Sequence, residues 1–211
     1  MEITEIFHSI QGEGSRIGIP TTFIRTTRCN LRCEWCDTKY AWEDGEQIEV
    51  TEILDKVNNI GCEHICLTGG EPLIQEESLV LIDSLLETDR FEVLVETNGS
   101  IDIEPIINRE VIVSMDYKTP SSKMNEEMID DNLDKLRKQD QLKFVISDQE
   151  DYNFAKEICK KAPGHTEMIF QPAGGGLERL RWIAESIIQE RLDVRVLPQL
   201  HKIIWPGEKS R

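Results

Sequence analysis

The sequence has no apolar run near the roughly 18 residues of a membrane-spanning helix. Its start has no basic segment followed by an apolar one, so we expect no signal peptide. Basic residues are few, because 24 Lys and Arg stand against 40 Asp and Glu, a formal net charge of −16. A domain this acidic is poorly suited to grip a phosphate backbone or an anionic membrane. We therefore expect a cytoplasmic protein with no nucleic-acid or membrane partner.

Internal repeats and low-complexity tracts are also missing. The 39% hydrophobic and 30% charged residues are typical of a folded globular protein and exclude a disordered or fibrous chain. The chain has 211 residues. At roughly 150 residues per domain, we expect one domain spanning 1–211.

Short β-branched runs alternate with longer amphipathic runs, which predicts βα units and a mainly parallel sheet. Thr51 is the expected N-cap of the first helix, and Gly61 follows its end. Eight complete units usually need about 250 residues, so this α/β chain is predicted to form an incomplete (β/α) barrel with about six core strands. The strands are expected at 21–26, 64–68, 91–96, 110–115, 141–146, 167–171 and 194–197, and the helices at 51–59, 77–86, 126–138, 152–160 and 177–190.

Polar residues follow the predicted strands, at the edge where barrels and open α/β sheets place their active sites. Loops begin there in any case, so this pattern alone does not separate a site from ordinary loop polarity. The segments are Arg25 onward, Thr68-Gly69-Gly70, Glu96-Thr97-Asn98-Gly99, Asp116–Lys118 and Gln171-Pro172.

The densest group of reactive side chains is Cys29, Cys33 and Cys36, a C-x3-C-x2-C spacing in the loop after strand 21–26. In an intracellular chain such a group more often serves metal or redox chemistry than disulfides. Structural zinc usually needs four ligands, and a redox C-x-x-C pair would leave Cys29 unexplained. Three thiolates suit a [4Fe-4S] cluster with one open iron, where a cofactor can bind. Zinc and metal-free buried thiols are the alternatives.

That spacing, with Trp35 before the last cysteine, resembles the signature of the radical S-adenosylmethionine superfamily. Thr68-Gly69-Gly70-Glu71-Pro72 resembles its GGE motif, and Glu96-Thr97-Asn98-Gly99 resembles the segment that ends its third strand. The resemblance implies a partial (β/α) barrel, a [4Fe-4S] cluster and S-adenosylmethionine cleaved to a 5′-deoxyadenosyl radical. We expect Gly70 to let the backbone approach the methionyl amino group. Because the radical is carried by the cofactor, no catalytic side chain is expected.

The segment Phe7-His8-Ser9-Ile10-Gln11-Gly12-Glu13-Gly14, with the tail Gln199-Leu200-His201-Lys202, resembles the 7-carboxy-7-deazaguanine synthase family over essentially the whole chain. This resemblance implies a lyase of queuosine and archaeosine biosynthesis, hence of tRNA modification. The implied reaction converts 6-carboxy-5,6,7,8-tetrahydropterin to 7-carboxy-7-deazaguanine and ammonia, by hydrogen abstraction at C6 and ring contraction. It further implies Mg²⁺, an electron donor such as flavodoxin or ferredoxin, and a homodimer.

The resemblance also implies the site residues. Residues 1–20 would bind substrate, and residues 195–211 would cap it. Arg25 offers a planar fork suited to the substrate carboxylate. The expected iron ligands are Cys29, Cys33 and Cys36, and the expected Mg²⁺ ligand is Thr38. Substrate is assigned to Ile10, Gln11, Gly12, Glu13, Arg25, Thr68 and His201, and the cofactor to Trp35, Cys36, Asp37, Gly70, Glu71, Asp116, Tyr117, Lys118, Gln171, Pro172, Ala173 and Gly174.

Two alternatives of other kinds remain open. An activase that installs a glycyl radical on a partner protein would share the cysteine loop but would not need Gln11-Gly12-Glu13-Gly14 or Mg²⁺. A non-enzymatic iron–sulfur or zinc module would need a fourth protein ligand. Cys62 and Cys66 could suggest a second metal site, but Cys66 lies in a predicted buried strand, where small thiols are common.

Overall fold

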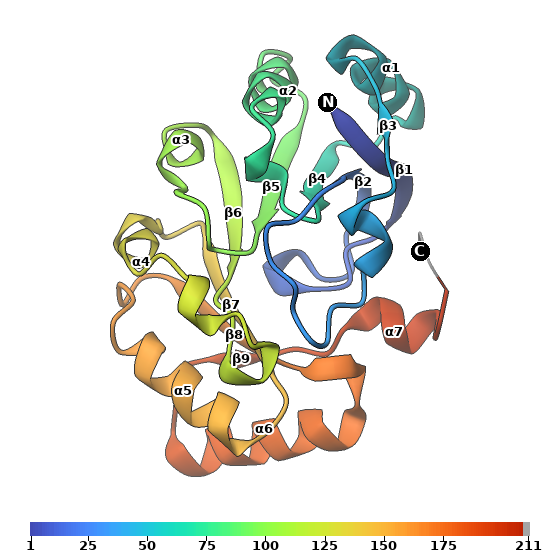
Figure 1. Cartoon of the computed structure of the whole chain (residues 1–211). Helices are drawn as coiled ribbons and strands as arrows, with labels where there is room; N and C mark the ends of the chain where they lie inside the picture. Colours follow the sequence, from blue (N-terminus) through green and yellow to red (C-terminus); the bar gives the residue numbers. More distant parts are fainter. Residues whose placement is uncertain (209–211) are drawn as a thin grey trace.

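The computed structural model describes residues 1–208, whose strands form one curved sheet (Figure 1). The strand order is β3-β1-β2-β4-β5-β6-β7-β8-β9. Strand β1 (Glu2–Ile10) pairs antiparallel with β2 (Pro20–Thr26) and β3 (Glu46–Gln47). Every neighbouring pair from β2 onward is parallel: β4 (His64–Gly69), β5 (Glu92–Thr97), β6 (Val111–Asp116), β7 (Gln141–Ile146), β8 (Glu167–Pro172) and β9 (Arg195–Val196).

The sheet curves without closing, since β3 and β9 stand at the two ends of the order and do not pair with each other. Strand β9 has only two residues, which leaves β2 and β4 to β8 as the long parallel strands. The predicted incomplete α/β barrel with about six core strands is therefore confirmed.

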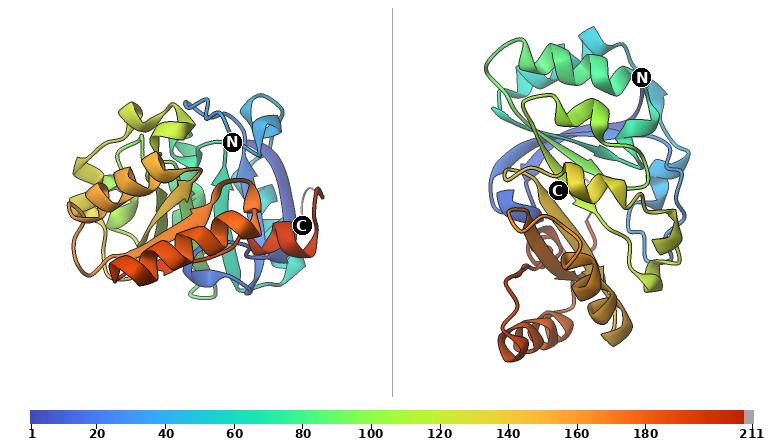
Figure 2. Two further views of the ribbon diagram at one scale, coloured as in Figure 1. Left: turned by 90° about the horizontal axis from the view of Figure 1, so that it is seen from below. Right: turned by 90° about the vertical axis from the view of Figure 1, so that its left-hand side faces the viewer.

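Helices α1 to α6 lie along the outer side of the curved sheet, whereas the short α7 lies beside the cavity (Figures 1 and 2). Helices α5 and α6 pack together there, with the rings of Tyr152 and Trp182 5.7 Å apart. No helix in residues 1–208 is long and apolar enough to cross a membrane. The helices are α1 (Val50–Ile60), α2 (Glu77–Leu86), α3 (Glu104–Ile107), α4 (Asp131–Lys135), α5 (Gln149–Cys159), α6 (Leu177–Glu190) and α7 (Leu200–Ile204).

Successive strand residues point to opposite faces, so each parallel strand contributes to two layers. The face beneath the helices is a continuous apolar core that includes Ile24, Leu67, Val95 and Phe144. The inner face starts with a small apolar cluster, which closes the bottom of the barrel, and becomes polar toward the carboxyl ends of the strands. That cluster consists of Phe23, Cys66, Leu94 and Ile112, with Phe7 packed against it.

Most predicted elements are confirmed within a few residues, and 77–86, 141–146 and 177–190 match in full. The continuous helix predicted at 126–138 is wrong, because this region holds only a 3-10 turn at Asn125–Glu127 and the five-residue α-helix Asp131–Lys135. Tertiary hydrogen bonds replace it: the buried amide of Asn132 bonds the backbone of Gly99, Ile101 and Ile103. The Arg137 guanidinium donates to the backbone carbonyl groups of Ile107, Arg109 and Val111.

Two further differences are local. Thr51 is not the N-cap of α1, since Glu49 holds that position without a side-chain bond, whereas Gly61 does end the helix in the left-handed conformation. Strand β1 was not predicted, because the register shift between Ile3 and Glu5 interrupts the alternation of apolar and polar residues that marks a half-buried strand.

Candidate active site

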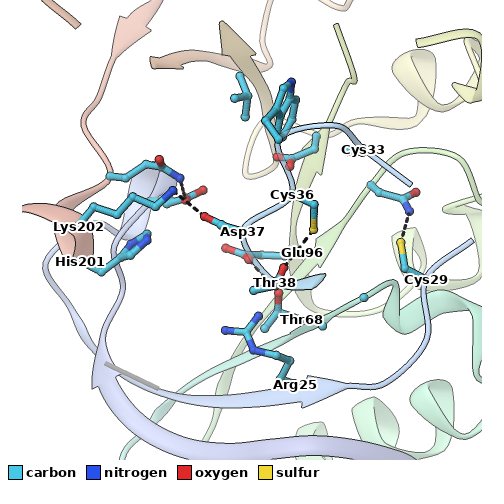
Figure 3. Close-up of a pocket in the computed structure, with 18 of the residues that line it drawn as sticks. Arg25, Cys29, Cys33, Cys36, Asp37, Thr38, Thr68, Glu96, His201 and Lys202 are labelled. Carbon is cyan, nitrogen blue, oxygen red and sulfur yellow. Dashed lines mark hydrogen bonds and ion pairs between the residues drawn. The ribbon is translucent and has the colours of Figure 1, made fainter. Parts of the chain in front are cut away.

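One cavity of about 580 Å³ opens at the carboxyl ends of the parallel strands, above the inner apolar cluster. Each long parallel strand contributes a polar residue of its inner face to the cavity lining. Figure 3 shows how Arg25, Thr68 and Glu96 point into this space from neighbouring strands. Because these residues share the inner face, the sheet itself fixes their spacing. The six residues are Arg25, Thr68, Glu96, Asp116, Lys143 and Gln171.

The three clustered cysteines line the same cavity, on the loop between β2 and the short helical turn Lys39–Trp42. The backbone of the loop is tied down at Arg28, which donates its N–H to Ala41 and accepts from Glu71 at 2.8 Å. The Cys29 thiol accepts weak bonds from the Leu31 N–H at 3.4 Å and from Asn98 at 3.7 Å. The loop thus presents three thiols, all unbridged, to the cavity.

These thiols suit a multi-iron cluster better than a single ion. Burial raises the pKa of Cys29 and of Cys33, although Lys118 opposes this at both thiols and the hydrogen bonds from Leu31 and Asn98 oppose it at Cys29. Thiolates in such a place need a bound cationic group to stay deprotonated. Within residues 1–208 no three His, Cys, Asp or Glu side chains gather closely enough to hold one metal ion. Three thiols spread along one loop instead fit the corners of a [4Fe-4S] cluster.

Gly70 lets the segment after β4 pack directly against the cysteine loop. A Cβ at this position would overlap the carbonyl group of Arg28 and come within 2.9 Å of the Cys29 nitrogen. Gly70 also lines the cavity, so its expected approach to the cofactor stays a prediction, and the contact that requires glycine in this structure is with the backbone of the cysteine loop. The GGE segment therefore fixes the position of the first cysteine.

Glu71 joins the same segment to the end of β5. Its fully buried carboxylate accepts from the Leu73 N–H, the Thr97 hydroxyl and the Asn98 N–H, at 2.6 to 3.0 Å. Burial raises the pKa of Glu71 to about 7, against the lowering effect of these donors. Glu71 does not line the cavity, so its role in this structure is to connect two site loops.

The other residues assigned to the cofactor divide into two groups. Trp35, Asp37, Asp116, Lys118, Gln171 and Gly174 line the cavity. Lys118 bonds Asp116 at 2.9 Å and lies 5.4 Å from the centre of the Trp35 ring. Burial would lower the pKa of Lys118, but Asp116 and Cys33 raise it to about 12, so it stays a cation.

The second group lies outside the cavity. The Tyr117 side chain packs in the outer core against Phe144 and Phe154 and donates its hydroxyl to Asp130. Pro172, the last residue of β8, and Ala173 after it are buried and contribute no lining surface.

On the β2 side, Arg25 is held in a fixed orientation. Its Nε donates to Glu5 at 2.7 Å, and Glu5 also accepts from the Tyr40 hydroxyl at 2.9 Å. The terminal nitrogens of the guanidinium consequently face the cavity (Figure 3). A fork held in this way is suited to bidentate recognition of a carboxylate.

Next to Arg25, Glu96 accepts from the Thr68 hydroxyl at 3.0 Å and from the Gln11 amide at 3.3 Å. Of the other N-terminal residues assigned to substrate, Glu13 lines the cavity, whereas Ile10 and Gly12 do not. Ile10 lies at the end of β1, opposite Pro20.

On the β7 side, Glu13 is the centre of a buried polar network. It accepts from Lys143 and Gln171 at 2.8 Å and from Gln199 at 2.6 Å. Lys143 also lies 3.2 Å from Asp116, which links the Glu13 end of the cavity to the Lys118 end. Burial would raise the pKa of Glu13, but Lys143, His201 and the Gln171 bond together hold it well below its usual value.

The C-terminal segment completes the cavity wall. The Leu200 N–H donates to the Gly12 carbonyl at 2.8 Å, and a Cβ on Gly12 would overlap the His201 ring. Lys202 pairs with Asp37 on the cysteine loop at 2.6 Å (Figure 3). The tail thus bridges the N-terminal segment and the cysteine loop. Residues 209–211 of the predicted 195–211 capping tail lie outside the described residues.

Three buried polar atoms that belong to cavity-lining residues have neither a hydrogen-bond nor an ion-pair partner among residues 1–208: Trp35 Nε1, Gln171 Oε1 and Gln199 Oε1. An unsatisfied buried polar group costs free energy, so a native structure rarely keeps several together. Their concentration here indicates a ligand with complementary donors and acceptors.

The sequence-based assignment missed several lining residues, chiefly Glu96, Lys143 and Gln199. A signal was present for Lys143, since a charged residue inside the apolar run Gln141–Ile146 must face a polar interior. The two scattered cysteines do not form a second site: Cys62 donates to the Pro20 carbonyl, and Cys66 packs in the inner apolar cluster.

Comparison with known proteins gives consistent results. A family model described as the Radical SAM superfamily matches residues 23–165. A protein from Thermoplasma acidophilum named 7-carboxy-7-deazaguanine synthase is 45% identical over 97% of both chains. A protein of the same name from Koribacter versatilis is 37% identical over 99% of this chain and 98% of its own. The crystal structure of QueE from Escherichia coli superposes with a TM-score of 0.76 over 92% of both chains, at 24% identity, and supports the fold.

Proposed function

Because this chain belongs to the radical S-adenosylmethionine superfamily and, within it, to the family of the 7-carboxy-7-deazaguanine synthases, we propose that it makes 7-carboxy-7-deazaguanine and ammonia from 6-carboxy-5,6,7,8-tetrahydropterin. This is a lyase reaction of 7-deazapurine biosynthesis. The observation that carries the proposal is a single cavity that joins three loop cysteines to a guanidinium and a buried carboxylate. A glycyl-radical activase would not need these last two groups, and neither would an electron-carrying module.

The [4Fe-4S] cluster and S-adenosylmethionine, when bound, supply the radical that removes a hydrogen atom at C6 and starts the ring contraction. Cys29, Cys33 and Cys36 are the residues that would hold the cluster, and Trp35, Asp37, Asp116, Lys118 and Gly174 line the space beside it. Lys118 is a fixed cation suited to a carboxylate group of the cofactor. The chain's own contribution is to position the reactants and exclude water.

The substrate would lie between the two polar ends of the cavity. Arg25 would bind its carboxylate, since two of its donors face the cavity and Glu5 fixes their direction. Glu13 and Gln11 would bind the aminopyrimidinone edge, with Thr68 and His201 beside them. The single domain 1–211, with residues 1–20 and 195–211 as substrate-binding segments, is part of the same proposal.

Mg²⁺ is proposed at Thr38, whose hydroxyl lines the cavity 3.7 Å from the Cys36 sulfur. A hard divalent ion prefers oxygen ligands and keeps several waters. Because no cluster of acidic side chains stands in the described part of the chain to hold one metal ion, its other oxygens would come from the substrate and water.

The proposed partners are an electron donor, such as flavodoxin or ferredoxin, and a second copy of the chain. Arg28, Arg32 and Lys39 are exposed around the cysteine loop of an otherwise acidic protein and would suit an acidic donor. The exposed Leu177 and Ile188 on α6 would suit a homodimer contact. A cytoplasmic location stays a prediction.

The test is anaerobic reconstitution with iron and sulfide, followed by incubation with 6-carboxytetrahydropterin, S-adenosylmethionine, reductant and Mg²⁺. We expect 7-carboxy-7-deazaguanine and ammonia in equal amounts. Cys33→Ala should lose bound iron and all turnover, whereas the matched control Cys62→Ala should keep both. Turnover by the Cys33→Ala variant, or no turnover by a fully reconstituted wild type, would contradict the proposal.

A further inference from the structure

The network around Glu13 leaves a set of acceptors in the wall of the cavity. Glu13 Oε2 accepts from both Lys143 and Gln171, and Oε1 accepts from Gln199. A carboxylate has about four acceptor positions, so one on Oε1 remains. Since Lys143 and His201 hold Glu13 ionised, it can only accept hydrogen bonds.

The ionised carboxylate determines how the two amides are oriented. An amide beside an acceptor must present its NH2 group to it, and its carbonyl oxygen then points elsewhere. Gln171 and Gln199 both do so, and both carbonyl oxygens are buried and unpartnered. The side chains are themselves buried, with 1% and 5% of their residue surface exposed, so water does not satisfy these oxygens freely.

These acceptors belong to a different wall of the cavity from Arg25. Glu13, Gln171 and Gln199 meet at β7, β8 and the C-terminal segment, whereas Arg25 stands on β2, with the other parallel strands between them. In the proposed substrate the carboxylate and the ring amino group likewise stand at opposite ends of the bicyclic ring. A carboxylate at Arg25 therefore directs the amino end toward the acceptors.

We propose that Gln199 is a specificity-determining residue, whose unpartnered carbonyl oxygen selects ring systems with an amino group on the pyrimidine ring. The inference rests on the proposed function, because it concerns the ring bound at that site. In a ring with a carbonyl oxygen in place of the amino group, that oxygen would face the Gln199 carbonyl oxygen, and two buried acceptors cannot form a hydrogen bond with each other. Sites built to receive an N–H reject analogues that lack it for this reason.

The experiment compares pterin-6-carboxylate with lumazine-6-carboxylate, which carry an amino group and an oxygen at the same ring position. Both are titrated by fluorescence into the reconstituted enzyme with S-adenosylmethionine and Mg²⁺. We expect the wild type to prefer the pterin by about 10- to 100-fold. Gln199→Met should weaken the binding of pterin-6-carboxylate and leave the binding of lumazine-6-carboxylate unchanged, so that the preference for the pterin falls to a few-fold. Gln189→Met, at an exposed position of α6, should retain the preference.

A purely structural role for Gln199 predicts that Gln199→Met weakens both compounds equally. That result, or an unchanged preference in Gln199→Met, would overturn the inference while leaving the proposed function intact. Failure of the wild type to bind either compound and to turn over the tetrahydropterin would overturn both.

Discussion

Lys143 is the buried cation on which two carboxylates of the site depend, and its removal should be costly. Its side chain is 3% exposed, and its Nζ lies 2.8 Å from Glu13 and 3.2 Å from Asp116. Removing one partner of a buried ion pair typically destabilises a protein by about 3–5 kcal/mol, since the other charge stays buried without a counterion. For a chain of this length about 2–4 °C in Tm corresponds to 1 kcal/mol, so Lys143→Met should lower the Tm by about 6–20 °C at pH 7.

The pH dependence separates this cause from a simple packing defect. With Lys143 present, the pKa of Glu13 in the folded protein is lower than the ordinary value of 4.5. The ionised Glu13 therefore contributes its full stabilisation at any pH above 4.5, and this contribution is lost only as the pH falls through the lower pKa of the folded protein. Without Lys143, burial is opposed only by His201 and the Gln171 bond, so we expect the pKa of Glu13 to rise and protonation to relieve the buried charge. The Tm difference between wild type and Lys143→Met should therefore narrow from pH 7 to pH 5.

The measurement is anaerobic thermal unfolding by circular dichroism at both pH values, with three comparison variants. Lys143→Arg keeps the positive charge, so its Tm should fall less than that of Lys143→Met. Adding Glu13→Gln to Lys143→Met should recover part of the loss, because it removes one of the unpaired charges. Lys56→Met, at an exposed pair on α1, should change the free energy of unfolding by under about 0.5 kcal/mol. A Tm of Lys143→Met within about 3 °C of wild type, or a difference independent of pH, would refute the reasoning.

Three further predictions concern the cysteine loop and the substrate end. Gly70→Ala should lower the iron content after reconstitution, because its Cβ would displace the loop at Arg28. The control Gly164→Ala, at a position with open space around it, should bind iron normally. Equal iron contents in the two variants would argue against this role for Gly70. Arg25→Ala should weaken pterin-6-carboxylate binding while reductive cleavage of S-adenosylmethionine continues, and equal loss of both would contradict a substrate role. The raised pKa of Glu71, about 7 against an ordinary 4.5, means that the folded protein holds a proton that the unfolded chain has released. The free energy of unfolding, measured with urea, should thus fall by about 3 kcal/mol as the pH rises from 4.5 to 7. Glu71→Gln should remove this pH dependence. If the variant keeps the wild-type pH dependence, other groups are responsible for it.

Local sequence was sufficient for the parallel strands, the longer helices and the cysteine loop. The pattern of apolar residues in 141–146 fits a buried strand, and the pattern in 177–190 fits an amphipathic helix. Both elements were therefore predicted with the bounds that the structure shows. The loop 29–36 was found because its ligands are neighbours in the chain. The helix predicted at 126–138 failed because the buried Asn132 and Arg137 make bonds to distant backbone groups, which no local pattern records.

The sequence by itself determined the alternation of strands and helices, and it brought the three cysteines together within eight positions. Only the tertiary structure decided how the rest of the cavity is assembled. Lys143, Gln171 and Gln199 meet Glu13 from positions 130 to 186 residues away. The role of Gly70 became visible only when the Arg28 carbonyl was in place against it. Secondary structure follows from periodicity over a few residues, whereas burial and the partners of a buried charge depend on which strands become neighbours in the sheet.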